Sequence, residues 1–270
     1  MVFQNILGAI EENVDYLIVG KRLGTTNLGL YTLGYRAPEL AITSLPSVIS
    51  NVVYPAYAKI QDDKEALRSS IHKTIQLVSW VAVPAGIGLA MISSAFILTF
   101  YTAKWESAIP VMQLLSLYAM VYTLTYNFGD AYKAMGRPDI LNLLSISTII
   151  FTVLVLWFGA NFGIIGIAWA HLFRVILLGV AQVVIVNKMT SMSPWQVLEA
   201  IIKPLICAGI MVAVMWQAPL LMGRDNSLTI LIVQILLGSI AYVVSSWFIN
   251  RSVTLTIWTM GRSLIKSGDK

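Results

Sequence analysis

Residues 1–40, MVFQNILGAIEENVDYLIVGKRLGTTNLGLYTLGYRAPEL, place acids and arginines inside segments that are otherwise apolar enough to lie in a lipid bilayer. A charge at the bilayer centre costs roughly 3 kcal/mol on translocon scales, so such charges usually face a bundle interior or a watery cavity. On a helix, Gln4, Gly8, Glu11 and Asp15 share one face because they lie three or four residues apart. We therefore expect a polar stripe that lines a cavity.

The composition is that of a membrane protein. Hydrophobic residues make up 57% of the chain and charged residues 11%, against about 45–50% and about 25% in soluble proteins. The uncharged runs 140–157 and 228–249 have about the 18–20 residues that span the hydrocarbon core as helices. They do not alternate as barrel strands do, so we predict an all-α fold.

The apolar runs predict a polytopic transmembrane bundle of about eight helices. A Gly- and Asn-rich turn over residues 23–29 closes the first hairpin, and Pro38, Pro46 and Pro55 should bend the second helix. The expected spans are 2–20, 30–58, 72–100, 108–132, 140–160, 163–187, 196–220 and 227–249.

Small residues mark close helix contacts. Ala82, Gly86 and Ala90 repeat every four residues, a spacing that lets a neighbouring helix approach closely. The stretch 159–163, GANFG, has a similar spacing, but we interpret it as a hairpin connector.

Lysine and arginine predict the orientation. They gather in residues 59–73, 133–137, 188–203 and 251–270, whereas the opposite loops hold far fewer. By the positive-inside rule both termini are cytoplasmic. The formal net charge of +5 does not indicate nucleic-acid binding, because the basic residues lie at helix ends rather than in one soluble patch.

A series of short motifs carries a family resemblance. The chain resembles bacterial polysaccharide flippases of the multidrug/oligosaccharidyl-lipid/polysaccharide exporter superfamily, and most of all the colanic-acid and teichuronic-acid exporter branch. The motifs lie within residues 5–190, in this order: NVDYLIVGKRLG (13–24), LGLY (28–31), YRAPEL (35–40), YPA (54–56), IQDDK (60–64), KWE (104–106), IPV (109–111) and MGRP (135–138).

The resemblance implies one lobe of a two-lobe exporter that flips lipid-linked (polyprenyl pyrophosphate) oligosaccharide across the bacterial inner membrane by alternating access. Residues 1–190 would form the carboxy-terminal lobe of about six helices, 191–250 two additional helices, and 251–270 a cytoplasmic tail. Family members have an additional amino-terminal lobe of about six helices. We therefore expect this chain to be a fragment whose amino-terminal lobe is missing.

Three arginines are candidate substrate ligands: Arg36, Arg174 and Arg22. A guanidinium recognises pyrophosphate through bidentate hydrogen bonds. Arg36 can also pair with Glu39, three residues on, as a structural ion pair. Arg174 shares a helix face with His171 and would either line the cavity or bond the carbonyls of a broken helix.

Four acids are candidates for ion coupling: Asp15, Glu11, Glu12 and Glu39. Burial favours the neutral carboxyl, so a buried acid can take up and release a proton or bind a cation.

Two further groups are open to alternatives. Asp130 and Lys133 form either a gate or a surface pair. Tyr118, Tyr122 and Tyr126 recur every four residues, which would suit sugar stacking, although packing or an interfacial belt is the simpler interpretation.

The sequence contains no GxSxG, GxxxxGK[ST], HExxH or CxxC motif, so we expect no enzymatic activity, no cofactor and no metal. Expected partners are membrane lipids, a glycan polymerase and other export proteins. The alternative functions are a cation-coupled multidrug exporter, an integral-membrane glycan polymerase or ligase, and a non-transporting membrane partner of a glycan-assembly complex.

Overall fold

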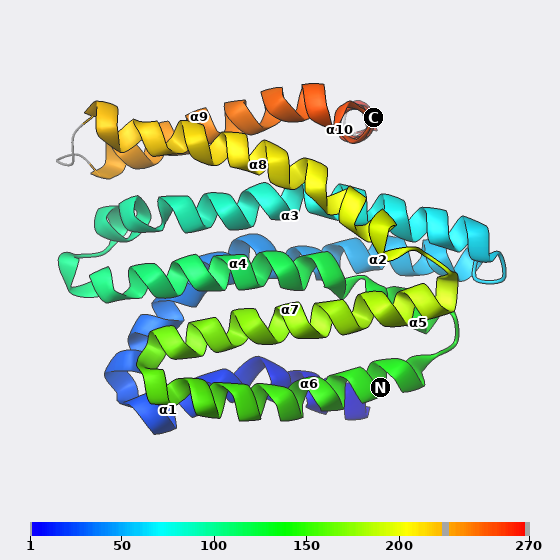
Figure 1. Cartoon of the computed structure of the whole chain (residues 1–270), viewed down its shortest axis with the longest axis horizontal. Helices are drawn as coiled ribbons and strands as arrows, with labels where there is room; N and C mark the ends of the chain where they lie inside the picture. The colour runs from blue at the N-terminus through cyan, green and yellow to red at the C-terminus, as the bar shows by residue number, and fades with distance from the viewer. Residues whose placement is uncertain (1, 223–226, 268–270) are drawn as a thin grey trace.

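Long helices lie side by side in layers, and no strand occurs in the part of the chain that the structure describes (Figure 1). The structure is a computed structural model that describes residues 2–222 and 227–267. Within them, the side chains of residues 2–9, 11, 12, 218–222, 227 and 260–267 are not described. The predicted all-α membrane bundle is confirmed.

The first helix, α1 (Val2–Pro38), has two limbs that meet at Gly24, where φ is 82° and ψ is 174°. Glycine adopts this backbone conformation at little cost because it lacks a Cβ. The predicted turn over 23–29 is therefore wrong in extent: one residue breaks the helix, and the second limb begins well before residue 30.

The second predicted helix is interrupted, as its prolines indicated. A π-helical turn, η1 (Glu39–Thr43), follows Pro38, and α2 (Leu45–Lys59) continues the segment. Proline removes a backbone hydrogen bond, and π-helical turns are frequent at functional sites. This segment can bend.

The third helix, α3 (Lys64–Phe100), starts earlier than residue 72, because the side chain of Asp63 accepts hydrogen bonds from the amides of Glu65 and Ala66 at 3.0 Å each. After the 3₁₀ turn η2 (Ala103–Ala108), the span predicted at 108–132 divides at Asn127 into α4 (Ile109–Tyr126) and α5 (Phe128–Ala134).

The remaining helices are close to the predicted ranges. They are α6 (Pro138–Gly159), the 3₁₀ turn η3 (Ala160–Phe162), α7 (Gly163–Thr190), α8 (Pro194–Met222) and α9 (Ser227–Ile249). Gly163 has a φ of 73°, which confirms the hairpin connector. Within the expected tail at 251–270, residues 251–267 form a further helix, α10 (Arg251–Ser267).

Five segments of the described residues are long and apolar enough to cross a membrane, and they include six of the eight predicted spans, since the segment 138–190 contains both α6 and α7. The first two predicted spans are not among them. In α1, acids and bases interrupt the apolar runs, and α2 has only 15 residues.

Helices α8 and α9 join the bundle. They form an outer layer on α3 (Figure 1). The three helices share an apolar core that includes Cys207, Met211 and Met215. Trp80 of α3 donates from Nε1 to Ser246 Oγ at 2.7 Å, and the Tyr242 hydroxyl donates to the Trp80 carbonyl at 2.9 Å.

The small-residue stripe packs α3 against α4, as predicted. A Cβ added at Gly86 would lie 2.5 Å from Met120 Cβ and 3.0 Å from the Ser116 carbonyl oxygen. Real Cβ atoms do not approach so closely, so glycine sets the spacing of the two helices.

Gly86→Val is therefore expected to destabilise the bundle by about 2–3 kcal/mol, because overpacking forces the helices apart. The melting temperature in detergent should fall by roughly 6 °C. Gly88→Ala is the control, since its Cβ would lie 3.8 Å from the nearest atom, Met211 Cε. Equal melting temperatures for the two variants would contradict this account of the packing.

Candidate functional site

Three buried polar side chains meet between the two limbs of α1 and helix α7. The Tyr31 hydroxyl lies 2.7 Å from Asp15 Oδ2 and 2.9 Å from His171 Nε2. The His171 nitrogen is 3.7 Å from the same carboxylate oxygen. Asp15 is 5% exposed, Tyr31 0% and His171 4%. The three side chains therefore form a hydrogen-bonded row that is shielded from solvent.

Arg174 adds a buried positive charge one turn along α7, at 4% exposure. Its Nη1 donates to Thr152 Oγ1 of α6 at 2.6 Å, and its Nη2 donates to the Tyr118 hydroxyl of α4 at 3.2 Å. The Tyr118 ring lies edge-on to His171, with centroids 5.1 Å apart. Burying a charge is costly unless it is compensated. The buried acid Asp15 and the buried base Arg174 can compensate each other.

The row has two arrangements that differ by one proton. With Asp15 ionised, His171 Nε2–H donates to the Tyr31 oxygen and the Tyr31 O–H donates to Asp15. With Asp15 protonated, its O–H donates to the Tyr31 oxygen and Tyr31 donates to an unprotonated Nε2. Uptake of one proton therefore reverses both hydrogen bonds. In the second arrangement the neutral ring carries its proton on Nδ1, which is buried and has no hydrogen-bond partner within the described residues.

Tyrosine rings connect this buried cluster to the surface. Tyr35 stacks on Tyr31 with centroids 6.3 Å apart and approaches Tyr118 at 6.1 Å. Tyr118 and Tyr122 stack at 6.0 Å, and Tyr122 and Tyr126 lie 5.5 Å apart. The predicted tyrosine stripe is thus a continuous packed row, which favours the packing interpretation for its inner members.

The predicted pair of Arg36 and Glu39 forms at the surface. The Nη1–Oε2 distance is 3.1 Å, with 62% and 39% of the side chains exposed. Arg36 also lines an open cavity of about 530 Å³, together with Thr25, Thr32 and Tyr101.

The exposed faces of the helices differ in polarity. After Arg36, the exposed positions include Ser44, which lies between η1 and α2, and Ser47 and Asn51 of α2, among apolar side chains. Along α7, by contrast, the exposed positions from Ile165 to Val184 are all apolar. The α7 face suits lipid, whereas the η1–α2 face suits a cavity or another protein surface.

The three predicted arginines have different partners. The partners of Arg22 are Asn161 and Trp157 rather than those of Arg174. Arg22 Nη2 donates to Asn161 Oδ1 at 2.8 Å, and the guanidinium carbon of Arg22 lies 4.3 Å from the centroid of the Trp157 ring. The predicted acids Glu11 and Glu12 lie outside the side chains that the structure describes. Of the four acids proposed for ion coupling, only Asp15 is seen in the buried cluster.

Asp130 and Lys133 approach each other at 3.6 Å, but a surface pair is the wrong description for the acid, whose side chain is 3% exposed. Asp130 Oδ2 accepts from Ser50 Oγ at 2.5 Å and from Asn127 Nδ2 at 3.2 Å. Asn127 is the residue that divides α4 from α5. This second cluster therefore connects α2 to the helix break, at the end of the bundle where Lys133 lies.

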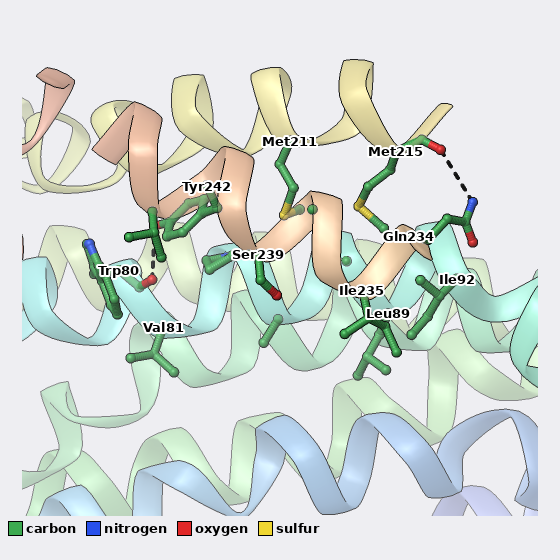
Figure 2. A pocket seen from close by; sticks show the side chains of 15 residues that line it. Trp80, Val81, Leu89, Ile92, Met211, Met215, Gln234, Ile235, Ser239 and Tyr242 are labelled. Carbon is green, nitrogen blue, oxygen red and sulfur yellow. Dashed lines mark hydrogen bonds between the residues drawn. The ribbon is translucent and has the colours of Figure 1, made fainter. Parts of the chain in front are cut away.

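An apolar cavity of about 350 Å³ lies between α3, α8 and α9 (Figure 2). Met211 and Met215 reach it from α8, Tyr242 and Ile235 from α9. Its polar lining residues include Ser239 and Gln234, and Gln234 Nε2 donates to the Met215 carbonyl at 3.5 Å. Among the described residues, no group of three or more His, Cys, Asp or Glu side chains could hold a metal ion.

The helix arrangement matches that of a solved membrane protein. The chain aligns with the lipid II flippase MurJ in its inward closed conformation with a TM-score of 0.72, at 21% sequence identity, over 92% of this chain and 52% of that one. The chain thus has an all-α membrane bundle of the MurJ-like flippase fold.

Sequence comparison finds similar proteins of polysaccharide biosynthesis. Residues 1–110 match the model of the family described as "Polysaccharide biosynthesis protein". The lipopolysaccharide biosynthesis protein WzxC of Escherichia coli (strain K12) is 31% identical over 169 residues, which is 62% of this chain and 34% of that protein. The teichuronic acid biosynthesis protein TuaB of Bacillus subtilis (strain 168) is 28% identical over 136 residues, 50% of this chain and 28% of that protein. The resemblance indicated by the motifs is confirmed, because the matched family model and both relatives are described as polysaccharide biosynthesis proteins.

The chain covers only part of each of these proteins. It spans about half of the MurJ chain, and the stretches matched in WzxC and TuaB make up about a third of each.

Proposed function

We propose that this chain is the carboxy-terminal lobe of a polysaccharide exporter, which flips a polyprenyl pyrophosphate-linked oligosaccharide across the bacterial inner membrane by proton-coupled alternating access and without chemical catalysis. The observation that carries the proposal is the buried row Asp15–Tyr31–His171 with Arg174 beside it, inside a bundle of flippase fold. The relatives are named for lipopolysaccharide and teichuronic acid biosynthesis, which supports a glycan cargo.

The surroundings of Asp15 favour a proton over a metal cation as the coupling ion. Both of its oxygens accept from donors: Oδ1 from the Tyr16 amide at 2.8 Å and Oδ2 from the Tyr31 hydroxyl. A bound metal cation needs several oxygen ligands instead. The nearby positive charge of Arg174 opposes a second positive charge on His171, so the added proton belongs on Asp15.

Protonation of Asp15 would change the electrostatic interactions and the hydrogen bonds inside the bundle. It removes the negative charge that offsets Arg174 and reverses the hydrogen bonds that hold the two limbs of α1 against α7. The break at Gly24 and the π-helical turn η1 are the points where these segments can bend. We propose that this change shifts the equilibrium between inward-facing and outward-facing states.

The substrate would lie against the polar face of α1, η1 and α2, where Arg36 is exposed. A guanidinium binds pyrophosphate through charge-assisted, bidentate hydrogen bonds. The second lobe would cover this face and close the cavity. The polyprenyl chain would suit the apolar cavity between α3, α8 and α9.

The orientation follows from the charged end of the bundle. The connections α2–α3, α5–α6 and α7–α8 lie at one end in Figure 1. The residues in and directly beside them include the basic residues Lys59, Lys64, Lys133, Arg137 and Lys188. We propose that this end is cytoplasmic. Partners such as a glycan polymerase would then meet the outward-facing end, where the product leaves.

Arg36→Ala in an exporter that carries this lobe with a second one is expected to lower export about tenfold, because one charge-assisted interaction of about 1.5 kcal/mol with the pyrophosphate is lost. Lipid-linked oligosaccharide should accumulate on the cytoplasmic side, which a glycan-accessibility assay on membranes measures. Arg137→Ala is the matched control, since Arg137 is also exposed and pairs with an acid, Asp139, at 2.8 Å. Unchanged export by Arg36→Ala would contradict the role of this residue.

A further inference from the structure

The last helix, α10, runs in a different direction from the bundle. In Figure 1 it is seen end-on beside the end of α9, whereas the long helices run across the view. If those helices cross the membrane, α10 lies along the membrane surface.

The first turn of α10 is fixed to the bundle. Val253 and Thr254 are buried, at 5% and 6% exposure. Thr254 Oγ1 lies 2.8 Å from Ser246 Oγ of α9 and 3.3 Å from Trp80 Nε1 of α3. The direction of α10 is therefore set by contacts with two spanning helices.

The sequence of α10, RSVTLTIWTMGRSLIKS, divides into two faces at helical spacing. With 100° per residue, one half of the circumference holds the apolar positions Val253, Ile257, Trp258, Met260, Leu264 and Ile265. The other half holds the hydroxyl residues Ser252, Thr256, Thr259 and Ser263, together with Arg251, Arg262 and Lys266. Leu255 is the exception on the polar half. No acid occurs between residues 251 and 267.

This pattern is typical of helices that lie in a membrane interface, which have a wide apolar face and a basic polar face. Trp258 is 59% exposed on the protein, and tryptophan favours the headgroup level of a bilayer. The apolar positions beyond the first turn would enter the lipid, and the basic positions would meet headgroups.

We propose that α10 lies in the surface of the leaflet at the basic end of the bundle and binds anionic phospholipid headgroups through Arg251, Arg262 and Lys266. Charge complementarity selects this occupant. The face carries positive charge and hydroxyls without a carboxylate, and anionic headgroups at a membrane surface attract lysine and arginine. The proposal is independent of which substrate the protein moves.

The test uses the full chain in lipid nanodiscs. Cys207 is the sole cysteine, so Cys207→Ala gives a background for single cysteines at Thr259→Cys on the polar half and Trp258→Cys on the apolar half, where the protein leaves Trp258 59% exposed. A membrane-impermeant maleimide should modify Thr259→Cys at least tenfold faster than Trp258→Cys when the discs contain phosphatidylglycerol. Equal rates in those discs would overturn the proposal, because α10 would then be in water or covered by another protein on both faces.

A second comparison tests the charges. Replacing phosphatidylglycerol by phosphatidylcholine should reduce the difference in rate several-fold. Arg262→Gln with Lys266→Gln should remove this dependence on lipid charge, whereas Lys104→Gln, in the loop at the opposite end of the bundle, should leave it intact. The proposal would also be overturned if the rate difference were the same in phosphatidylglycerol and phosphatidylcholine discs for all three proteins, namely the parent, the Arg262→Gln with Lys266→Gln variant and the Lys104→Gln variant. Headgroup charge would then play no part.

Discussion

Asp15→Asn in a two-lobe exporter that carries this chain is expected to lower glycan export by roughly 100-fold, near the upper end of typical coupling free energies of 1–3 kcal/mol. An amide keeps the size of the side chain and an oxygen that accepts from Tyr31 at the position of Oδ2. It cannot take up a proton, so the two hydrogen bonds of the row cannot reverse. Export of labelled polysaccharide to the cell surface measures the effect.

Two matched variants separate this effect from misfolding. Asp15→Glu keeps a titratable group and should restore part of the export. Asp139→Asn changes an exposed acid that is 62% accessible and should export normally. The melting temperature of Asp15→Asn should stay within a few degrees of the parent. A variant that exports at the parental rate would remove Asp15 from the mechanism.

Arg174→Met is expected to destabilise the bundle by about 3 kcal/mol, because removing one charge of a buried, compensated set leaves the other uncompensated. Thermal unfolding in detergent measures this. Methionine has a similar length and no charge, so the cavity it leaves is small. The hydroxyls of Tyr118 and Thr152 also lose their bonds to the guanidinium.

The double variant Asp15→Asn with Arg174→Met is the sharper test. Without the carboxylate the missing guanidinium matters less, so the double variant should be more stable than Arg174→Met alone. Non-additivity of this kind is the sign of direct energetic coupling between two sites. If the two changes simply add, the charges of Asp15 and Arg174 do not compensate each other.

Part of the site was predictable from charge alone. Asp15 and Arg174 stand out in the sequence because ionisable residues are rare in apolar spans, and His171 lies three residues from Arg174. Tyr31 and Thr152 were missed as site residues. Tyrosine and threonine are common in membrane helices, and only the hairpin at Gly24 brings Tyr31 against an acid 16 residues earlier.

The fold was predictable where hydropathy is the controlling property. The positions of α6, α7, α8 and α9 follow from apolar runs and glycine turns. The break at Asn127 was not predictable in the same way, since it depends on the buried contacts of Asp130 with Ser50 of α2. The single-residue break at Gly24 was placed too broadly, because Thr25, Thr26 and Asn27 are typical of turns although here they continue the helix.

The helix α10 shows a different limit. A hydropathy reading of residues 251–270 indicates a polar tail, because hydroxyl and basic residues alternate with apolar ones. The apolar positions form one face only when they are arranged at helical spacing. Its contact with Trp80 and Ser246, which sets its direction, depends on tertiary structure.

Proton coupling is tested most directly by the rate at which a reconstituted two-lobe exporter carrying this chain flips a fluorescent lipid-linked oligosaccharide in liposomes under an imposed pH gradient. We predict that the rate rises several-fold with the proton gradient, does not respond to a sodium gradient, and loses its response to the pH gradient in Asp15→Asn. A rate that follows sodium and ignores the pH gradient would contradict proton coupling at the Asp15–Tyr31–His171 row.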